Sequence, residues 1–175
     1  STVGYLMKLL KAAYGENISD AETLRARMYA KKEEIVQKDG FPQIPGVKEA
    51  IKRLHDEGFR LEVASSSAGY YIGRVLGALE IRQYFECYTS GEEVEHPKPA
   101  PDTFLRAMEK LNLKPEDCII VEDSTNGGKA AAAAGAKCVW FHNPDSGDQQ
   151  ILHAVLTITS WSPENVDKLI DLMHA

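Results

Sequence analysis

The sequence has no surplus of basic residues. Its 175 residues include 20 Lys and Arg against 26 Asp and Glu, which gives a formal net charge of −6. Because proteins that bind nucleic acid gather a basic excess on one face, we expect no nucleic-acid partner. No apolar run reaches the length of about 18 residues that a membrane-spanning helix requires, so we also expect no membrane partner.

Cysteine is scarce, with only Cys87, Cys118 and Cys138. An odd number of cysteines, two of them in apolar runs typical of strands, argues against a disulfide framework or a zinc site. We therefore expect reduced thiols and a cytoplasmic location. The composition, 43% hydrophobic and 26% charged, excludes the disordered and fibrous classes and indicates a globular protein.

The first 45 residues contain helical patterns and no strand pattern. Apolar residues recur at helical spacing over 2–14. A long, highly charged helix is predicted over 20–38, with Leu24, Met28 and Ile35 facing inward. We expect this stretch to be organised separately from the rest of the chain.

From residue 46 onward, helix and strand patterns alternate. This alternation predicts an α/β fold with a parallel sheet and helices on both faces. The apolar run 118–121 is typical of a strand buried on both sides. The predicted strands lie near 60–65, 87–89, 118–122, 137–141 and 156–159, and the predicted helices at 47–54, 70–79, 101–112, 125–134 and 163–173.

Ser65, Ser66 and Ser67 follow the predicted strand at 60–65. Ligands of open parallel sheets bind beyond the carboxyl ends of the strands, so these serines are candidates for a binding site. A hydroxyl group there, with the backbone N–H groups of the next helix, is suited to a phosphate oxygen. The alternative is that the serines only cap that helix.

Lys98 lies on a proline-rich loop, between Pro97 and Pro99 and shortly before Pro101. Three prolines in five residues restrict the backbone, so the ammonium group is presented from a stiff segment. The nearby His96 is interpreted as a solvated turn residue without a chemical role.

Glu122 and Asp123 directly follow the apolar run 118–121. Two adjacent carboxylates at a buried strand end repel each other and lose hydration, so they favour a bound cation. Carboxylate oxygens suit Mg²⁺, which retains waters and takes further oxygens from a substrate phosphate. The alternative is that Asp123 caps the following helix while Glu122 points to solvent.

Taken together over 46–143, these motifs resemble the haloacid dehalogenase superfamily, in its phosphatase and β-phosphoglucomutase branch with a helical cap. The resemblance is carried by PGV, VASSS, KPAPDTF and IIVEDSTNG followed by AAAAGA, in that order and at the usual spacings. It implies a Rossmann-like parallel sheet in a three-layer α/β/α core over 46–175. It also implies that 1–45 is the remnant of a helical cap.

The resemblance also implies a role for each candidate residue. Ser65 matches the hydroxyl that holds the transferring phosphoryl group, with Ser66 and Ser67 as substrate-binding neighbours. Lys98 matches the lysine that neutralises the phosphoryl oxygens and the nucleophile. Glu122 and Asp123 match the acidic pair that binds Mg²⁺, Asp123 more directly. The implied function is a Mg²⁺-dependent phosphatase or phosphomutase that forms an aspartyl-phosphate from a small phosphorylated metabolite, with sugar phosphates as the first choice.

One element of the family pattern is missing. The nucleophile of the family lies in an Asp-x-Asp-Gly motif after the first strand, whereas Asp20 and Asp39 are the only aspartates among the first 45 residues and neither follows an apolar strand. The chain also begins at Ser1 without a Met. We therefore expect an inactive fragment of a longer enzyme, with an open slot in the sheet where unpaired backbone groups remain. The alternatives are a non-catalytic binding protein of the same fold and a swapped oligomer that fills the slot.

Two smaller departures concern the substrate and the helix after the acidic pair. Ala68 stands where β-phosphoglucomutases usually carry a lysine, which favours a phosphatase over a mutase. Gly127 and Gly128 replace a glycine followed by an aliphatic residue, which predicts a looser helix start by about 1 kcal/mol. A dehalogenase, which works without metal, is disfavoured by the pair of Glu122 and Asp123.

Overall fold

The computed structural model describes residues 21–174, and the chain divides into two compact units, Ser1–Pro42 and Gln43–Ala175. The predicted helix at 2–14 lies outside the described residues. Whether the first unit is the remnant of a cap stays a prediction.

Helix α2 (Ala21–Asp39) is the described part of the first unit. Ile35 is 48% exposed, so the prediction that it faces inward is wrong. Charged side chains lie next to it: Glu34 precedes it in the sequence and pairs with Lys31 at 2.9 Å on the helix surface. This part of α2 is therefore polar. The side chains of Leu24 and Met28 lie outside the description.

All strand pairs in the described part of the second unit are parallel, as predicted. Strand β1 (Glu62–Ser65) pairs with β2 (Cys87–Ser90). Strand β4 (Lys137–Phe141) lies between β3 (Ile119–Glu122) and β5 (Leu156–Ile158). The predicted strand positions therefore agree with the structure to within about two residues.

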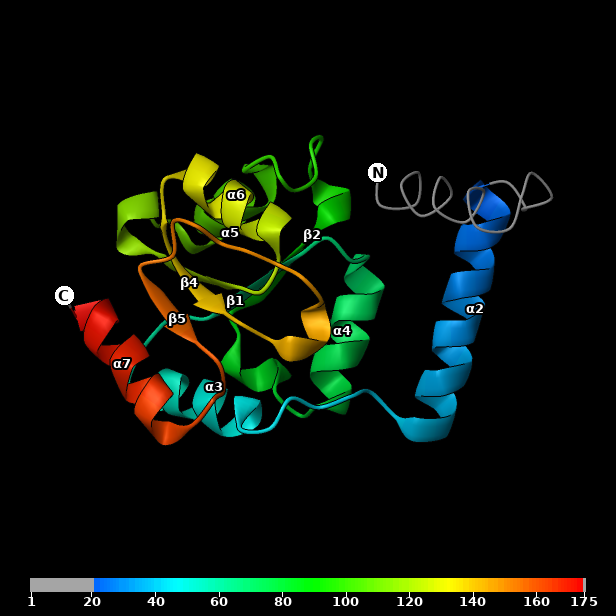
Figure 1. Cartoon of the computed structure of the whole chain (residues 1–175), viewed down its shortest axis with the longest axis horizontal. Coiled ribbons are helices and arrows are strands. Elements are labelled where there is room, and N and C mark those ends of the chain that lie inside the picture. Colours follow the sequence, from blue (N-terminus) through cyan, green and yellow to red (C-terminus); the bar gives the residue numbers. More distant parts are fainter. Residues whose placement is uncertain (1–20, 175) are drawn as a thin grey trace. The chain divides into compact units, whose positions relative to one another are not determined.

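Helices cover both faces of the strands, which makes the second unit the predicted three-layer α/β/α fold (Figure 1). On one face, Phe104 and Ala131 pack against Ile120. On the other, Ala50 and Leu169 pack against Val139. The first face carries α5 (Asp102–Leu111) and α6 (Thr125–Ala134), and the second carries α3 (Val47–Asp56), α4 (Gly69–Ala78) and α7 (Pro163–His174).

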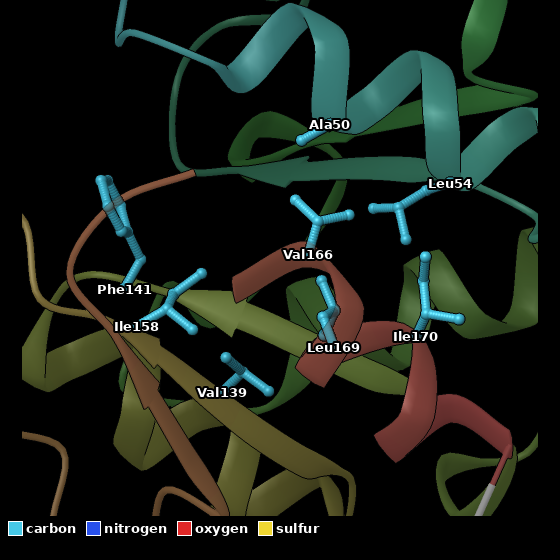
Figure 2. Close-up of a cluster of buried hydrophobic side chains, with 8 residues drawn as sticks. All are labelled: Ala50, Leu54, Val139, Phe141, Ile158, Val166, Leu169 and Ile170. Carbon is cyan, nitrogen blue, oxygen red and sulfur yellow. The ribbon is translucent and has the colours of Figure 1, made fainter. Parts of the chain in front are cut away.

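One buried cluster joins helices α3 and α7 to strands β4 and β5. Val139, Ile158 and Leu169 are at most 2% exposed. Burial of each such side chain stabilises the fold by about 1.5–3 kcal/mol. Figure 2 shows how the eight side chains face one another: Ala50, Leu54, Val139, Phe141, Ile158, Val166, Leu169 and Ile170.

The strands form two separate sheets with a cavity between them. Among the described residues, β1 pairs only with β2, and β3 pairs with β4 but not with β1. A cavity of about 650 Å³ is lined by β1 and β3, with residues of α5, α3 and α7 around it. Val121 lines this cavity and is 37% exposed, so the prediction that its strand is buried on both sides is wrong. The expected slot in the sheet is present.

Candidate functional site

The cavity between β1 and β3 brings together residues from three separate segments. Ser65, Ser66, Lys98, Glu122 and Asp123 all line it. The Lys98 ammonium group contacts both Ala64, near the carboxyl end of β1, and Glu122, at the carboxyl end of β3. The two carboxyl ends therefore meet at the same end of the cavity, where parallel sheets bind their ligands.

Ser67 does not line the cavity described above. Its backbone N–H donates to Ser65 Oγ at 3.1 Å, and its carbonyl accepts a hydrogen bond from Ser90 Oγ at 2.8 Å. Ser67 therefore holds the serine loop in place, and its predicted contact with substrate stays a prediction.

Lys98 is held in a buried ion pair. Its Nζ lies 2.5 Å from Glu122 Oε1 and 3.2 Å from the carbonyl oxygen of Ala64. The same nitrogen lies 4.2 Å from the centre of the Phe104 ring, a favourable cation–π distance. Both charged side chains are 10% exposed. The ammonium group is thus fixed at the edge of the cavity by contacts within the protein.

Both carboxylate oxygens of Glu122 are occupied. Besides the pair with Lys98, Oε2 accepts hydrogen bonds from the N–H groups of Asp123 (3.1 Å) and Ser124 (3.2 Å) and from Ser124 Oγ (3.0 Å). Ser124, rather than Asp123, caps helix α6 by accepting from the N–H of Gly127. The alternative in which Glu122 points to solvent and Asp123 caps the helix is therefore wrong.

The two glycines at the start of α6 make room for other side chains. A Cβ atom on Gly127 would lie 2.0 Å from Glu122 Cδ, and one on Gly128 would lie 2.7 Å from Ile151 Cγ2. Neither distance is compatible with a real side chain. Close packing therefore requires glycine at both positions, in addition to the predicted loosening of the helix start. The sequence alone does not reveal this packing requirement.

Asp123 differs from Glu122 in its partners. Its Oδ2 accepts a hydrogen bond from Ser146 Oγ at 2.5 Å, and within residues 21–174 it forms no ion pair. A half-buried carboxylate with only a neutral partner still favours a cation.

The donor set fits Mg²⁺ through Asp123. No group of three or more His, Cys, Asp or Glu side chains that could hold a metal ion occurs in the described part of the chain. Mg²⁺ needs only one or two carboxylates, together with waters and substrate phosphate oxygens. Asp123 can provide one such oxygen. Both oxygens of Glu122 already accept hydrogen bonds from Lys98 and the loop, and its direct contact with Mg²⁺ stays a prediction.

Ser65 is not the cap of the next helix, so that alternative is wrong. Helix α4 begins at Gly69, its N-cap position is Ala68, and the N–H of Gly69 donates to Glu92 Oε2 at 3.1 Å. That N–H is therefore already engaged by a carboxylate. Ser65 Oγ accepts from Ser67, which leaves its own proton able to reach an acceptor in the cavity.

The three cysteines are free thiols, as predicted. Burial raises the pKa of Cys138 to about 11, and burial also raises the pKa of Cys87 and of Cys118. A raised pKa keeps each thiol protonated and poorly nucleophilic at neutral pH. The cysteines are therefore poor candidates for the chemistry of this site.

His96 is exposed, and its Nδ1 lies 3.0 Å from Asp102 Oδ2. This position agrees with the interpretation of a surface turn residue.

No helix within 21–174 combines the length and the apolar character needed to span a bilayer.

Three residues around the site were missed by the sequence analysis: Glu92, Ser146 and Gln149. Glu92 engages the start of α4, and Gln149 Oε1 accepts from the N–H of Thr125 at the start of α6. Each acts on a partner more than 20 residues away, so no local pattern could have indicated it.

Charged and hydroxyl side chains thus gather at the carboxyl ends of parallel strands in a three-layer α/β fold. The sequence profile described as haloacid dehalogenase-like hydrolase matches residues 6–141. The chain belongs to this family of hydrolases.

Individual relatives agree with the family. Protein CbbY of Rhodobacter capsulatus is 34% identical over 125 residues, which cover 70% of this chain and 54% of that protein. Hexitol phosphatase B of Escherichia coli K12 is 31% identical over 105 residues, which cover 60% and 47% of the two proteins. The chain spans about half the length of these curated relatives.

Solved structures support the same fold. A CbbY variant from Rhodobacter sphaeroides, in complex with xylulose-1,5-bisphosphate, is 27% identical with a TM-score of 0.63, over 69% of this chain and 55% of that one. The β-phosphoglucomutase of Clostridium difficile is 21% identical with a TM-score of 0.71, over 98% and 78% of the two chains. The second likeness supports the fold alone.

Proposed function

We propose that this chain forms the phosphoryl-binding and cation-binding part of a Mg²⁺-dependent phosphatase for small phosphorylated metabolites, sugar phosphates first among them. The observation that carries the proposal is the convergence of Ser65, Lys98 and Asp123 on one cavity. The relatives named as a hexitol phosphatase and as a protein bound to a sugar bisphosphate favour this substrate class.

Each of the three residues has a distinct role in this proposal. The Ser65 hydroxyl donates to a phosphoryl oxygen, and the fixed Lys98 ammonium group neutralises charge on the phosphoryl group and the nucleophile. Asp123 supplies a carboxylate oxygen to Mg²⁺, while Glu122 keeps Lys98 in position. Mg²⁺, when bound, would neutralise the phosphoryl oxygens as a Lewis acid.

The nucleophile in this proposal is an aspartate on an extended segment that occupies the slot between β1 and β3. Both strands have an unpaired edge there, and an extended segment would satisfy both. Its carboxylate oxygen bonds to phosphorus as the bond from phosphorus to the ester oxygen breaks, and the departing oxygen takes up a proton. Water then attacks the phosphorus of the aspartyl-phosphate, releasing phosphate and the free carboxylate.

A phosphatase is preferred over a phosphomutase because Ala68 offers no charged group to a second phosphate. We also propose that residues 1–45 are the remnant of a helical cap. The competing proposal is a non-catalytic binding protein, favoured by the observation that residues 21–174 contain no group of three or more His, Cys, Asp or Glu side chains that could hold a metal ion.

The test is phosphate release from p-nitrophenyl phosphate by the protein expressed from its complete reading frame. We expect activity with Mg²⁺ that is lost with a chelator, and a loss of at least about 100-fold for Lys98→Ala and for Asp123→Asn. The matched controls are Lys114→Ala and Asp171→Asn, both at exposed positions. We expect the 175-residue chain alone to be inactive.

The outcomes separate the two proposals. Activity that survives Asp123→Asn would contradict the cation role, and activity in the pure 175-residue chain would contradict an external nucleophile. A complete protein that binds phosphate but hydrolyses no ester would favour the binding protein.

A further inference from the structure

Residues 143–151, here called the 143–151 loop, connect β4 to β5 and reach back to the candidate cation ligand. Within it, Asn143 Oδ1 accepts from the N–H of Asp145 and starts a short 3₁₀ turn, Pro144–Ser146. At the end of this turn, the half-buried Ser146 hydroxyl donates to Asp123 Oδ2 at 2.5 Å. Within the described part of the chain, the Asp123 carboxylate accepts this hydrogen bond from Ser146.

The 143–151 loop is itself attached to the start of α6. Gln149 Oε1 accepts from the N–H of Thr125 at 2.8 Å, and Gln149 Nε2 donates to the carbonyl of Ser146 at 3.2 Å. The N–H of Gln150 donates to Thr125 Oγ1 at 3.0 Å. Ile151 is 6% exposed and belongs to the core cluster on the α5 and α6 face. The loop is therefore fixed at one end by apolar packing and in its middle by hydrogen bonds.

The hydrogen bond from Ser146 acts on one oxygen of the Asp123 carboxylate. A hydroxyl group fixes one carboxylate oxygen but adds no charge, so the negative charge remains available to a cation. Lys98 acts differently on Glu122, because it neutralises that carboxylate. Partners that orient a metal ligand in this way contribute about 10- to 100-fold to metal affinity in known sites.

We propose that Ser146 is a positioning residue that orients Asp123 for a divalent cation, and that the 143–151 loop holds Ser146 in place. This inference rests on the proposed function, because it takes Asp123 as the cation ligand. It predicts that a change in the loop weakens cation binding without removing any atom that touches the phosphoryl group.

The experiment is a titration of the metal-free protein, expressed from its complete reading frame, with Mn²⁺, in which free Mn²⁺ is measured by electron paramagnetic resonance. We expect Ser146→Ala to weaken Mn²⁺ binding roughly tenfold and Ser146→Thr, which keeps the hydroxyl, to restore most of the affinity. Ser160→Ala, at an exposed position, is the control and should bind as the parent does. The Mg²⁺ concentration for half-maximal activity should rise in parallel, with kcat at saturating Mg²⁺ nearly unchanged.

A second variant covers the case in which Ser146→Ala fails to fold. Gln149→Ala removes the hydrogen bonds of Gln149 to Thr125 and Ser146 but keeps the side chains of Asp123 and Ser146. It should weaken Mn²⁺ binding about threefold, a smaller effect than removal of the Ser146 hydroxyl group. Unchanged Mn²⁺ affinity in Ser146→Ala, with affinity lost in Asp123→Asn, would overturn this inference alone. Unchanged affinity in Asp123→Asn as well would overturn the proposed cation role instead.

Discussion

The candidate site lies between two walls of the cavity, formed by β3 and by β1, and the side chains on these walls differ in their partners. On the β3 wall, Glu122 engages Lys98 and three donors of the following loop, and Gly127 lies directly against its carboxylate. On the β1 wall, Ser65 engages the N–H of Ser67, and Ser66 is exposed. The first wall is a hydrogen-bonded network around one ion pair, whereas the second offers hydroxyl groups to the cavity.

This difference predicts where substitutions will damage the protein. A network of buried charges is costly to interrupt, because each removed partner leaves another group unpaired. Exposed hydroxyl groups can be removed with little effect on folding. The β3 wall should therefore govern both stability and function, and the β1 wall mainly the contact with the ligand.

The largest effect is expected for Gly127→Ala. The new Cβ would lie 2.0 Å from Glu122 Cδ. The Glu122 carboxylate would therefore have to move, which would break its ion pair with Lys98. We expect a loss of about 4 kcal/mol or more in the free energy of unfolding, as for a broken buried ion pair, measured by urea denaturation. Gly77→Ala is the control: it lies in α4 with nothing within 4 Å of the new Cβ, and should stabilise by about 0.5–1 kcal/mol. Equal effects of the two variants would contradict the packing requirement at Gly127.

The next effect is expected for Lys98→Met. The variant keeps an apolar stem beside Phe104 but leaves the Glu122 carboxylate, 10% exposed, without its cation. We expect a loss of about 3 kcal/mol at neutral pH. The double variant Lys98→Met with Glu122→Gln should recover part of that loss, measured as a double-mutant cycle in urea. Additive single effects would argue that the two side chains do not stabilise each other.

A smaller effect is expected for Glu92→Ala, at the start of α4 beside the β1 wall. Glu92 Oε2 accepts from the N–H of Gly69, where a carboxylate also favours the helix dipole. We expect a loss of about 1 kcal/mol, read as a shift in the thermal midpoint. Glu95→Ala, at an exposed loop position, should change the midpoint far less. A shift of the same size in both variants would mean that net charge, rather than capping, is responsible.

The smallest effect is expected for Glu62→Gln, on the β1 wall. Burial raises the pKa of Glu62, although the hydrogen bond from Thr89 opposes this, and Oε2 is buried without a partner in the described part of the chain. A raised pKa means that the folded state favours the protonated form of Glu62. The contribution of Glu62 to the free energy of unfolding is therefore most favourable below its unfolded pKa and is lost as pH rises through its folded pKa. The neutral glutamine should therefore gain on the order of 0.5 kcal/mol at pH 7, and the gain should vanish below pH 4. A gain that persists at low pH would contradict the titration of Glu62.

The alternation of strands and helices could be predicted from the sequence because each pattern is local. A slot in the sheet could also be predicted, since the resemblance indicated that one strand was missing, but only the structure shows that it lies between β1 and β3. The partners of Glu122 and Asp123 could not, because Lys98 and Ser146 lie more than 20 residues away from them and meet them only in the folded sheet. The position of Ile35 could not be predicted from helical spacing alone, because it lies beside the Lys31–Glu34 ion pair on an exposed part of α2.

The most direct test of the central claim is to locate the phosphoryl group on the protein during turnover. The protein from the complete reading frame would be mixed with Mg²⁺ and a phosphomonoester, quenched rapidly in acid and analysed by peptide mass spectrometry. We expect a hydroxylamine-labile phosphoryl group on an aspartate that is not among the 175 residues of this chain, and we expect it to be absent from the Asp123→Asn variant. A phosphoryl group on Ser65, or on any other of the 175 residues, would contradict the proposed mechanism.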